Sequence, residues 1–228
     1  MRIKILCWNV RGLNDIEKRK LIKGVVRNKK PDLVCIMETK VKEMSVQMVN
    51  CVGVGRFLNW ASVDARGAVE GLLLFWDNRV LEKLEVESGG YSISVRFRNC
   101  VGFTWIFFGV YRSMIGSEKE DFWEELGAIC GLWEDPWCIG GDFNAVRFLE
   151  ERRNAPRLRI EMRRFSEVIG NLGLRDFPLA GGPFTWIGGL NSQVASRLDR
   201  FLISNQWEDR FSAITQSALP RLVSNHNP

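Results

Sequence analysis

Three acidic residues, Glu38, Asp142 and Asp199, border stretches of β-branched and aliphatic residues, where strands would hold them in fixed positions. Asn144 follows Asp142 by two residues, so in a strand both side chains point to the same side. Carboxylate and amide oxygens are the hard ligands that Mg²⁺ takes, leaving positions for water and phosphate. Taken singly, each acid is more typical of a solvated strand end or a salt bridge. The Gly-Gly-Asp-Phe-Asn sequence at 140–144 is the more specific signal, because its glycines let backbone approach closely.

The chain of 228 residues has one histidine, His226, which limits the chemistry open to it. Zinc sites that need several histidines and two-histidine iron sites are excluded. Any reaction must therefore rest on carboxylates, amides, Tyr, Lys, Arg and a single imidazole. The formal charge of +5 and the sequence pI near 9.0 are compatible with a polyanionic partner without requiring one.

The elements that would position these residues begin with a strand, a helix and a second strand. Residues 2–10 are apolar on both faces, which indicates an internal strand, and 32–39 form the second strand, which ends on Glu38. Between them, Asn14 and Glu17 are expected to form the capping pair at the start of the helix. The sequence therefore predicts a strand–helix–strand unit at the N-terminus.

The rest of the chain is richer in strands. Four β-branched or aromatic segments with short connections predict a meander over 57–63, 71–77, 91–97 and 102–111. Ser117 and Glu120 predict the start of a helix that buries the face containing Phe122 and Trp133, and another helix is expected at 159–172. Further strands are expected at 137–144, 183–186 and 197–204, before a short helix at 206–211. Two blocks of strands with helices outside both predict one α/β domain over residues 1–228, a four-layer sandwich of two mostly antiparallel sheets flanked by helices.

Seven short motifs occur in the order found in the endonuclease/exonuclease/phosphatase superfamily. They are Trp8-Asn9-Val10-Arg11-Gly12, Glu38-Thr39-Lys40, Gly109-Val110-Tyr111, Gly141-Asp142-Phe143-Asn144, Phe184-Thr185-Trp186, Arg197-Leu198-Asp199-Arg200-Phe201 and Ser224-Asn225-His226. The motifs span essentially the whole chain, which most resembles the endonuclease domain of plant LINE-type (non-LTR) retrotransposons. The resemblance implies a DNase I-like fold, Mg²⁺ as the cofactor with Mn²⁺ as a substitute, and nicking of DNA by phosphodiester hydrolysis. A reverse transcriptase domain, expected in a full-length relative, is absent from this chain.

The resemblance implies that one group of residues serves the cation and the attacking water. Glu38 would be the principal Mg²⁺ ligand, with Asn9 beside it. Asp142 would take the proton of the water, and Asn144 would face the water and the scissile phosphate. Asn225 would lie on the metal or water side of the site.

A second group would contact the DNA. By the same resemblance, Tyr111 would hydrogen-bond the phosphate, and His226, held by Asp199, would contact a phosphate oxygen. Thr185 would lie near the DNA backbone, and Arg11 would also contact DNA. The transition state at phosphorus carries negative charge, and fixed hydrogen-bond donors around it stabilise that charge.

Two features depart from the superfamily pattern. Asn225 stands where the pattern Ser-Asp-His has an acid, and the lost charge predicts weaker Mg²⁺ binding and weaker activation of the nucleophile. Only Asn227 and Pro228 follow His226, where the family has a further core strand. We therefore expect the last C-terminal strand to be missing and the terminal segment that carries His226 to fray. An impaired, truncated or decayed fragment that keeps the fold and DNA binding is thus the alternative to an active enzyme.

Other features leave the choice of partner open. A small-molecule phosphatase is disfavoured by the spacing between Phe184-Thr185-Trp186 and the strand after Arg197. The Arg-rich stretch at 147–164 is either a solvated helix face or a contact with the phosphate backbone. The six cysteines are expected to be reduced thiols, mostly in the core. No apolar run approaches the roughly 20 residues that span a bilayer. We expect a monomer without a membrane partner inside the cell, in the nucleus.

Overall fold

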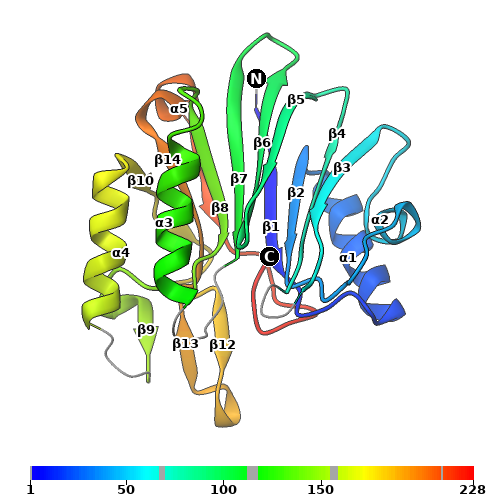
Figure 1. The fold of residues 1–228 in the computed structure, drawn as a ribbon. Helices are drawn as coiled ribbons and strands as arrows, with labels where there is room; N and C mark the ends of the chain where they lie inside the picture. The colour runs from blue at the N-terminus through cyan, green and yellow to red at the C-terminus, as the bar shows by residue number, and fades with distance from the viewer. Residues whose placement is uncertain (1, 67–69, 112–117, 155–158, 212) are drawn as a thin grey trace.

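The computed structural model describes residues 2–66, 70–111, 118–154, 159–211 and 213–228. Two β-sheets pack face to face, and helices cover the outer face of each, so that the layers run helix, sheet, sheet, helix (Figure 1). This arrangement confirms the predicted four-layer α/β sandwich. Among the described residues, no helix has the length and apolar character needed to cross a membrane.

The first sheet has four strands in the order β1-β2-β4-β3. β1 and β2 are parallel and joined by a helix, as the strand–helix–strand pattern predicted, and the other pairs are antiparallel. The elements of this half are β1 (Ile5–Asn9), α1 (Ile16–Lys29), β2 (Leu33–Met37), α2 (Val46–Val52), β3 (Leu58–Val63) and β4 (Leu72–Asp77). The short helix α2 was not predicted, because its seven residues carry too little periodicity to distinguish them from a loop.

The second sheet has six strands in the order β10-β14-β8-β7-β6-β5, of which β7 and β8 are parallel. Its elements are β5 (Leu81–Ser88), β6 (Ser92–Asn99), β7 (Thr104–Tyr111), α3 (Glu118–Cys130), β8 (Trp137–Asp142), α4 (Arg159–Asn171), β10 (Leu174–Asp176), β14 (Asp199–Ser204) and α5 (Asn205–Arg210). The predicted meander is therefore wrong as a single unit, since β3 and β4 belong to the first sheet. The edge strand β5 was missed because its exposed face is charged.

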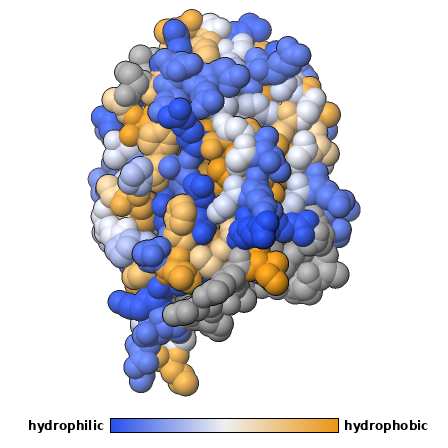
Figure 2. Space-filling view, turned by 90° about the vertical axis from the view of Figure 1, so that its left-hand side faces the viewer, coloured by the Kyte–Doolittle hydropathy of each residue, from blue (hydrophilic) through white to orange (hydrophobic). Residues whose placement is uncertain are grey.

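Short elements line one end of the sandwich. They are η1 (Leu149–Glu151), β9 (Arg152–Arg153), β11 (Leu179–Ala180), β12 (Trp186–Gly188), η2 (Leu190–Ser192), β13 (Val194–Ser196) and β15 (Gln216–Ser217). β12 and β13 form a hairpin that projects from the body of the molecule (Figure 1). Seen from the side of α4, the face above this projection mixes hydrophilic and apolar side chains (Figure 2). The predicted strand at 183–186 is displaced, because β12 begins only at Trp186.

The alternation of side chains in β4 shows how the layers are filled. Leu72, Leu74 and Trp76 belong to the core between the two sheets, whereas Leu73 and Phe75 pack in the cluster under α1 and α2. Successive residues of a strand point to opposite faces, so a strand with an apolar layer on each side reads as a continuous apolar run. A third cluster fills the space between the second sheet and the helices α3 and α4.

Glycines allow the two sheets to approach closely near the site. A Cβ added to Gly109 would lie 2.8 Å from Cys35 Sγ, and one added to Gly140 would lie 2.8 Å from Cys7 Sγ. At Gly141 a Cβ would collide with the carbonyl oxygen of Val110. The close approach expected from the Gly-Gly pair therefore occurs, with the other sheet at Gly140 and with the neighbouring strand β7 at Gly141.

Two expectations about chain details need correction. The N-cap of α1 is Asp15, whose carboxylate accepts a hydrogen bond of 2.7 Å from the Lys18 amide. Asn14 is not the cap, because the helix begins one residue later, and Glu17 pairs with a lysine at the surface instead of reaching back. The cysteines are not mostly in the core: Cys51 and Cys100 are exposed and Cys130 is half-buried, whereas Cys7, Cys35 and Cys138 are buried. The expected cap at Ser117 lies outside the described residues.

Candidate active site

Strand pairing brings the candidate residues to one end of both sheets. In the first sheet Asn9, the last residue of β1, pairs with Met37 at the end of β2, and Glu38 follows directly. In the second sheet Asp142, the last residue of β8, pairs with Tyr111 on one side. On its other side Asp142 pairs with Asp199, the first residue of the antiparallel β14. Parallel strands end at a common edge, which explains why acids far apart in the sequence meet here.

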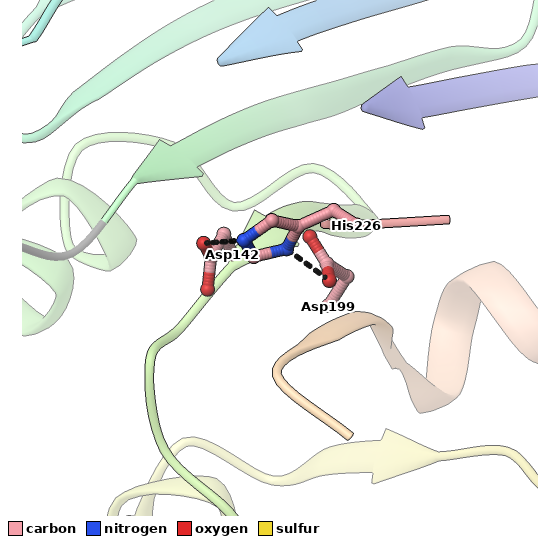
Figure 3. A group of neighbouring side chains, drawn as sticks. All are labelled: Asp142, Asp199 and His226. Carbon is pink, nitrogen blue, oxygen red and sulfur yellow. Dashed lines mark hydrogen bonds and ion pairs between the residues drawn. The ribbon is translucent and has the colours of Figure 1, made fainter. Parts of the chain in front are cut away.

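His226 lies between two carboxylates (Figure 3). Its Nδ1 is 2.8 Å from Asp199 Oδ2, and its Nε2 is 3.8 Å from Asp142 Oδ2. All three residues are buried. Asn9 joins the group from the other sheet, because its Nδ2 donates a hydrogen bond of 2.9 Å to Asp142 Oδ2. The site therefore spans the interface between the two sheets.

The segment that carries His226 is held by β1 and by β12 of the projecting hairpin. Ser224 Oγ donates to the Asn9 carbonyl oxygen over 2.6 Å and accepts from the His226 amide over 3.1 Å. Trp8 Nε1 donates to the His226 carbonyl oxygen, and His226 forms a bridge with Trp186 of β12. The expectation that this segment frays is therefore wrong, because β1 and β12 hold it in place.

Burial and neighbouring charges shift the pKa values of both Asp142 and His226. The pKa of Asp142 is raised to about 6, by burial and by the charge of Asp199, although His226 and Asn9 act in the opposite direction. Burial lowers the pKa of His226, but Asp199 and Asp142 raise it by more, to about 9. Near neutral pH the site thus holds an imidazolium between two carboxylates, with Asp142 able to accept a proton.

Glu38 lies beside two positively charged side chains. Its Oε1 is 3.0 Å from Lys40 Nζ and 3.8 Å from Arg11 Nε. Glu70, which precedes β4, also approaches: Lys40 Nζ is 3.8 Å from Glu70 Oε2, and the Tyr111 hydroxyl donates to the same oxygen over 3.4 Å. Burial raises the pKa of Glu38, yet hydrogen bonds with Glu70 and Lys40 outweigh it and leave that pKa below its ordinary value.

The pKa values of Glu70 and Tyr111 are raised, whereas that of Glu38 is lowered. The pKa of Glu70 is raised, first by burial and then by its hydrogen bond with Glu38. Burial, followed by the charges of Glu38 and Glu70, raises the pKa of the Tyr111 phenol far above its ordinary value, so its hydroxyl keeps its proton. Glu70 was missed by the sequence reasoning. The available signal was an acid directly before the apolar segment 71–77, at the strand end that faces Glu38 in an antiparallel sheet.

Four residues at the site have a left-handed backbone conformation that non-glycine residues rarely adopt. Their φ angles are 52° at Arg11, 56° at Glu38, 55° at Lys40 and 44° at Asn144. Each such residue costs about 1–2 kcal/mol, and such strain concentrates at functional sites. Hydrogen bonds hold the strained segments, including one of 2.7 Å from the Gly12 amide to the Glu38 carbonyl oxygen.

Three further candidates take different positions. The backbone amide of Asn144 donates to Asp142 Oδ1 over 2.9 Å, so the loop after β8 fixes this carboxylate. Thr185 is buried, and its Oγ1 accepts hydrogen bonds of 2.9 Å from the amides of Leu198 and Asp199. Thr185 thus positions the start of β14, and its contact with DNA stays a prediction. The Asn225 carbonyl oxygen accepts from an amide of β12.

A buried ion network lies behind the site. Arg200 Nη2 is 2.9 Å from Glu151 Oε2, and Arg197 Nη2 is 2.8 Å from Asp176 Oδ1. Burial raises the pKa of Glu151, but Arg200 outweighs this and leaves that pKa below its ordinary value. Arg147 also reaches Asp176, at 3.5 Å. The Arg-rich stretch is therefore not one solvated helix face: Arg147 ties the loop after β8 to β10, and Glu151 ties it to β14.

Most of the chain matches the sequence profile of a known protein family. The profile described as Endonuclease/Exonuclease/phosphatase family matches residues 6–226. The chain belongs to this family. No curated protein sequence is significantly similar to it.

Solved structures of endonuclease/exonuclease/phosphatase proteins share its fold. The AP endonuclease LMAP from Leishmania major has a TM-score of 0.75 at 16% identity, with 99% of this chain and 85% of that chain covered. The endonuclease domain of TRAS1, a telomere-specific non-LTR retrotransposon, has a TM-score of 0.74 at 15% identity, covering 99% and 94%. A 3′ phosphatase from Neisseria bound to a product DNA hairpin has a TM-score of 0.69 at 15% identity, covering 99% and 97%. At these identities the likeness shows the fold.

Members of the family generally use divalent metal ions, and the residues near Glu38 fit such an ion better than the His226 group does. Asp142, Asp199 and His226 offer ligand atoms within 4.8 Å of one another. An imidazolium hydrogen-bonded to Asp199 has no lone pair for a metal, however. Beside Glu38, by contrast, the Lys40 ammonium already occupies the position of a cation. Carboxylate oxygens of this kind are the ligands that Mg²⁺ prefers.

Proposed function

We propose that the protein is an Mg²⁺-dependent phosphodiesterase that nicks DNA, and that it is the endonuclease domain of a LINE-type retrotransposon of plants. The observation that carries this proposal is the buried imidazolium of His226 between Asp199 and Asp142, with Asn9 fixing Asp142 from the second sheet. The family of the chain, and the retrotransposon and DNA-bound proteins among its structural relatives, support the choice of DNA as substrate.

The side chains suggest a division of roles in hydrolysis. Asp142, with a pKa near 6, accepts a proton from a water molecule that attacks phosphorus. His226 is kept cationic by Asp199 and stabilises the negative charge that develops on a phosphate oxygen. Tyr111 keeps its proton and donates a hydrogen bond to the phosphate. Mg²⁺, held by Glu38 and Asn9, would supply further charge stabilisation when bound.

Two observations favour a second candidate, a domain that binds DNA and cleaves it poorly or not at all. Asn225 contributes no charge where the superfamily pattern has an acid, and Lys40 and Arg11 partly neutralise Glu38. Both features weaken the attraction for a divalent cation. Binding of DNA that falls with rising salt, without cleavage, would identify this candidate.

Conversion of supercoiled plasmid to open circle tests the proposal. The wild type with Mg²⁺ should nick the plasmid, and EDTA or Asp142→Asn should abolish nicking, while Asp209→Asn on the exposed side of α5 should not. A polymerase should extend the nicks directly if they carry a 3′-hydroxyl. Nicking that survives both EDTA and Asp142→Asn would contradict the proposal.

If the wild type is inactive, Asn225→Asp should recover nicking, because it returns the acid of the superfamily pattern to the site. A folded variant that remains inactive after this repair would contradict our account of the defect. We further propose that the protein acts as a monomer in the nucleus, where its substrate is.

A further inference from the structure

Glu70 is attached to the segment that carries Glu38. The Lys40 amide donates to the Glu70 carbonyl oxygen over 2.8 Å, and the Thr39 amide donates to the Gly71 carbonyl oxygen over 3.1 Å. Gly71 has a φ of 82°, and a Cβ there would collide with the Thr39 hydroxyl. The glycine therefore permits the close approach, and the paired backbones fix the position from which the Glu70 side chain extends.

Three groups from two segments, Glu38 and Lys40 after β2 and Tyr111 at the end of β7, meet the carboxylate of Glu70. The charge of Glu38 acts on it at close range, and the Tyr111 hydroxyl donates to it over 3.4 Å. Lys40 Nζ lies 3.0 Å from Glu38 Oε1 and 3.8 Å from Glu70 Oε2. The ammonium thus lies against both carboxylates, and its side chain is 46% exposed, so it can move away without unpacking the core.

We propose that Glu70 is a second carboxylate ligand of the divalent cation that Glu38 binds, and that Lys40 takes the place of this cation when it is absent. Two neighbouring carboxylates repel each other unless a positive charge compensates them. The acid missing at Asn225 leaves the site short of one charge, which Glu70 supplies beside Glu38. The inference rests on the proposed use of a divalent cation at this site.

Binding of Mn²⁺, followed through the electron paramagnetic resonance signal of the free ion, tests the inference without reference to activity. Glu70→Gln should weaken Mn²⁺ binding at least about tenfold, the range seen when groups that support a metal site are removed. The matched control is Glu87→Gln, an exposed glutamate of β5 that lies in the other sheet. It should bind Mn²⁺ as the wild type does. Urea unfolding of each variant establishes that it is folded.

A second variant gives a change of opposite sign. Lys40→Gln should bind Mn²⁺ several-fold more tightly, because the competing ammonium is gone, whereas general damage to the site would weaken binding. Asn225→Asp should restore the affinity that Glu70→Gln loses. Equal affinities of the wild type and Glu70→Gln, or no Mn²⁺ binding by the wild type, would overturn the inference.

The inference and the proposed function fail in different ways. A protein that binds Mn²⁺ through Glu70 but nicks no DNA would contradict the proposed function alone. A protein that nicks DNA, with Mn²⁺ affinity independent of Glu70, would contradict the inference alone.

Discussion

The pairing of His226 with Asp199 leads to a prediction that a single NMR signal can test, because the chain has one histidine. Asp199→Asn keeps the size of the side chain and removes its charge. The wild-type pKa of His226 is about 9 against an ordinary value of 6.5. The difference corresponds to about 3 kcal/mol of preference for the imidazolium in the folded protein. Little solvent screening applies, since 5% of the side chain is exposed.

In Asp199→Asn the pKa of His226 should fall toward 6.5, because burial then opposes the charge while Asp142 and Glu38 remain as the carboxylates that favour it. The sign of the stability effect follows from linkage. A histidine whose pKa is higher in the folded than in the unfolded state stabilises the fold fully below about pH 6.5, and this contribution is lost as the pH rises toward 9. The wild type should therefore lose about 3 kcal/mol more than the variant over this interval.

The assay is titration of the imidazole Hε1 resonance in the presence of EDTA, which keeps divalent cations out of the site. Urea unfolding at pH 6 and pH 9.5 measures the stability difference for both proteins, so that other titrating groups cancel. A wild-type resonance that titrates near 6.5, or one whose midpoint Asp199→Asn leaves unchanged, would refute the reasoning.

Three further predictions concern stability and are measured by urea unfolding. Glu151→Gln should destabilise the fold by about 3–5 kcal/mol, since it leaves the two buried guanidinium groups of Arg197 and Arg200 to share the carboxylate of Asp176; a loss below 1 kcal/mol would contradict this. Gly141→Ala should cost more than about 2 kcal/mol because of the collision with a backbone oxygen, whereas Gly127→Ala in α3, with open space around it, should be neutral or stabilising by up to about 1 kcal/mol. Asp15→Ala should cost about 1 kcal/mol through loss of the α1 cap, and an equal loss in Asn14→Ala would show that the cap is misassigned.

Much of the fold could be predicted because its strands are apolar on both faces. The segments around Leu33–Met37 and Leu72–Asp77 lie between two layers and read as unbroken apolar runs. An exposed edge such as β5 has alternating charges, which are also typical of a loop, and a seven-residue helix such as α2 shows less than two full turns of periodicity. The division of strands between two sheets could not be predicted, because it depends on contacts between distant residues.

In the candidate site, too, residues marked by local sequence could be predicted, and residues that depend on distant contacts could not. Asp142 and Asn144 were recognisable from local sequence, because glycines and a two-residue spacing are local features. Glu70 was not, since its partner Glu38 lies in another segment and only the pairing of β2 with β4 brings them together. The ordered position of His226 was also missed. It depends on contacts with β1 and β12, and both strands are distant from His226 in the sequence.

The close approach of the sheets at Gly140 has a consequence for how the site tolerates change in the core. A Cβ at Gly140 would lie 2.6 Å from the Phe201 ring and 2.8 Å from Cys7 Sγ. Gly140 precedes Asp142 by two residues, and Cys7 precedes Asn9 by two residues. The thickness of the packed interior at this point therefore sets the length of the hydrogen bond between Asn9 and Asp142. One added methyl group in the interior would act as a spacer, and it would move the two halves of the site apart while every polar side chain remained in place.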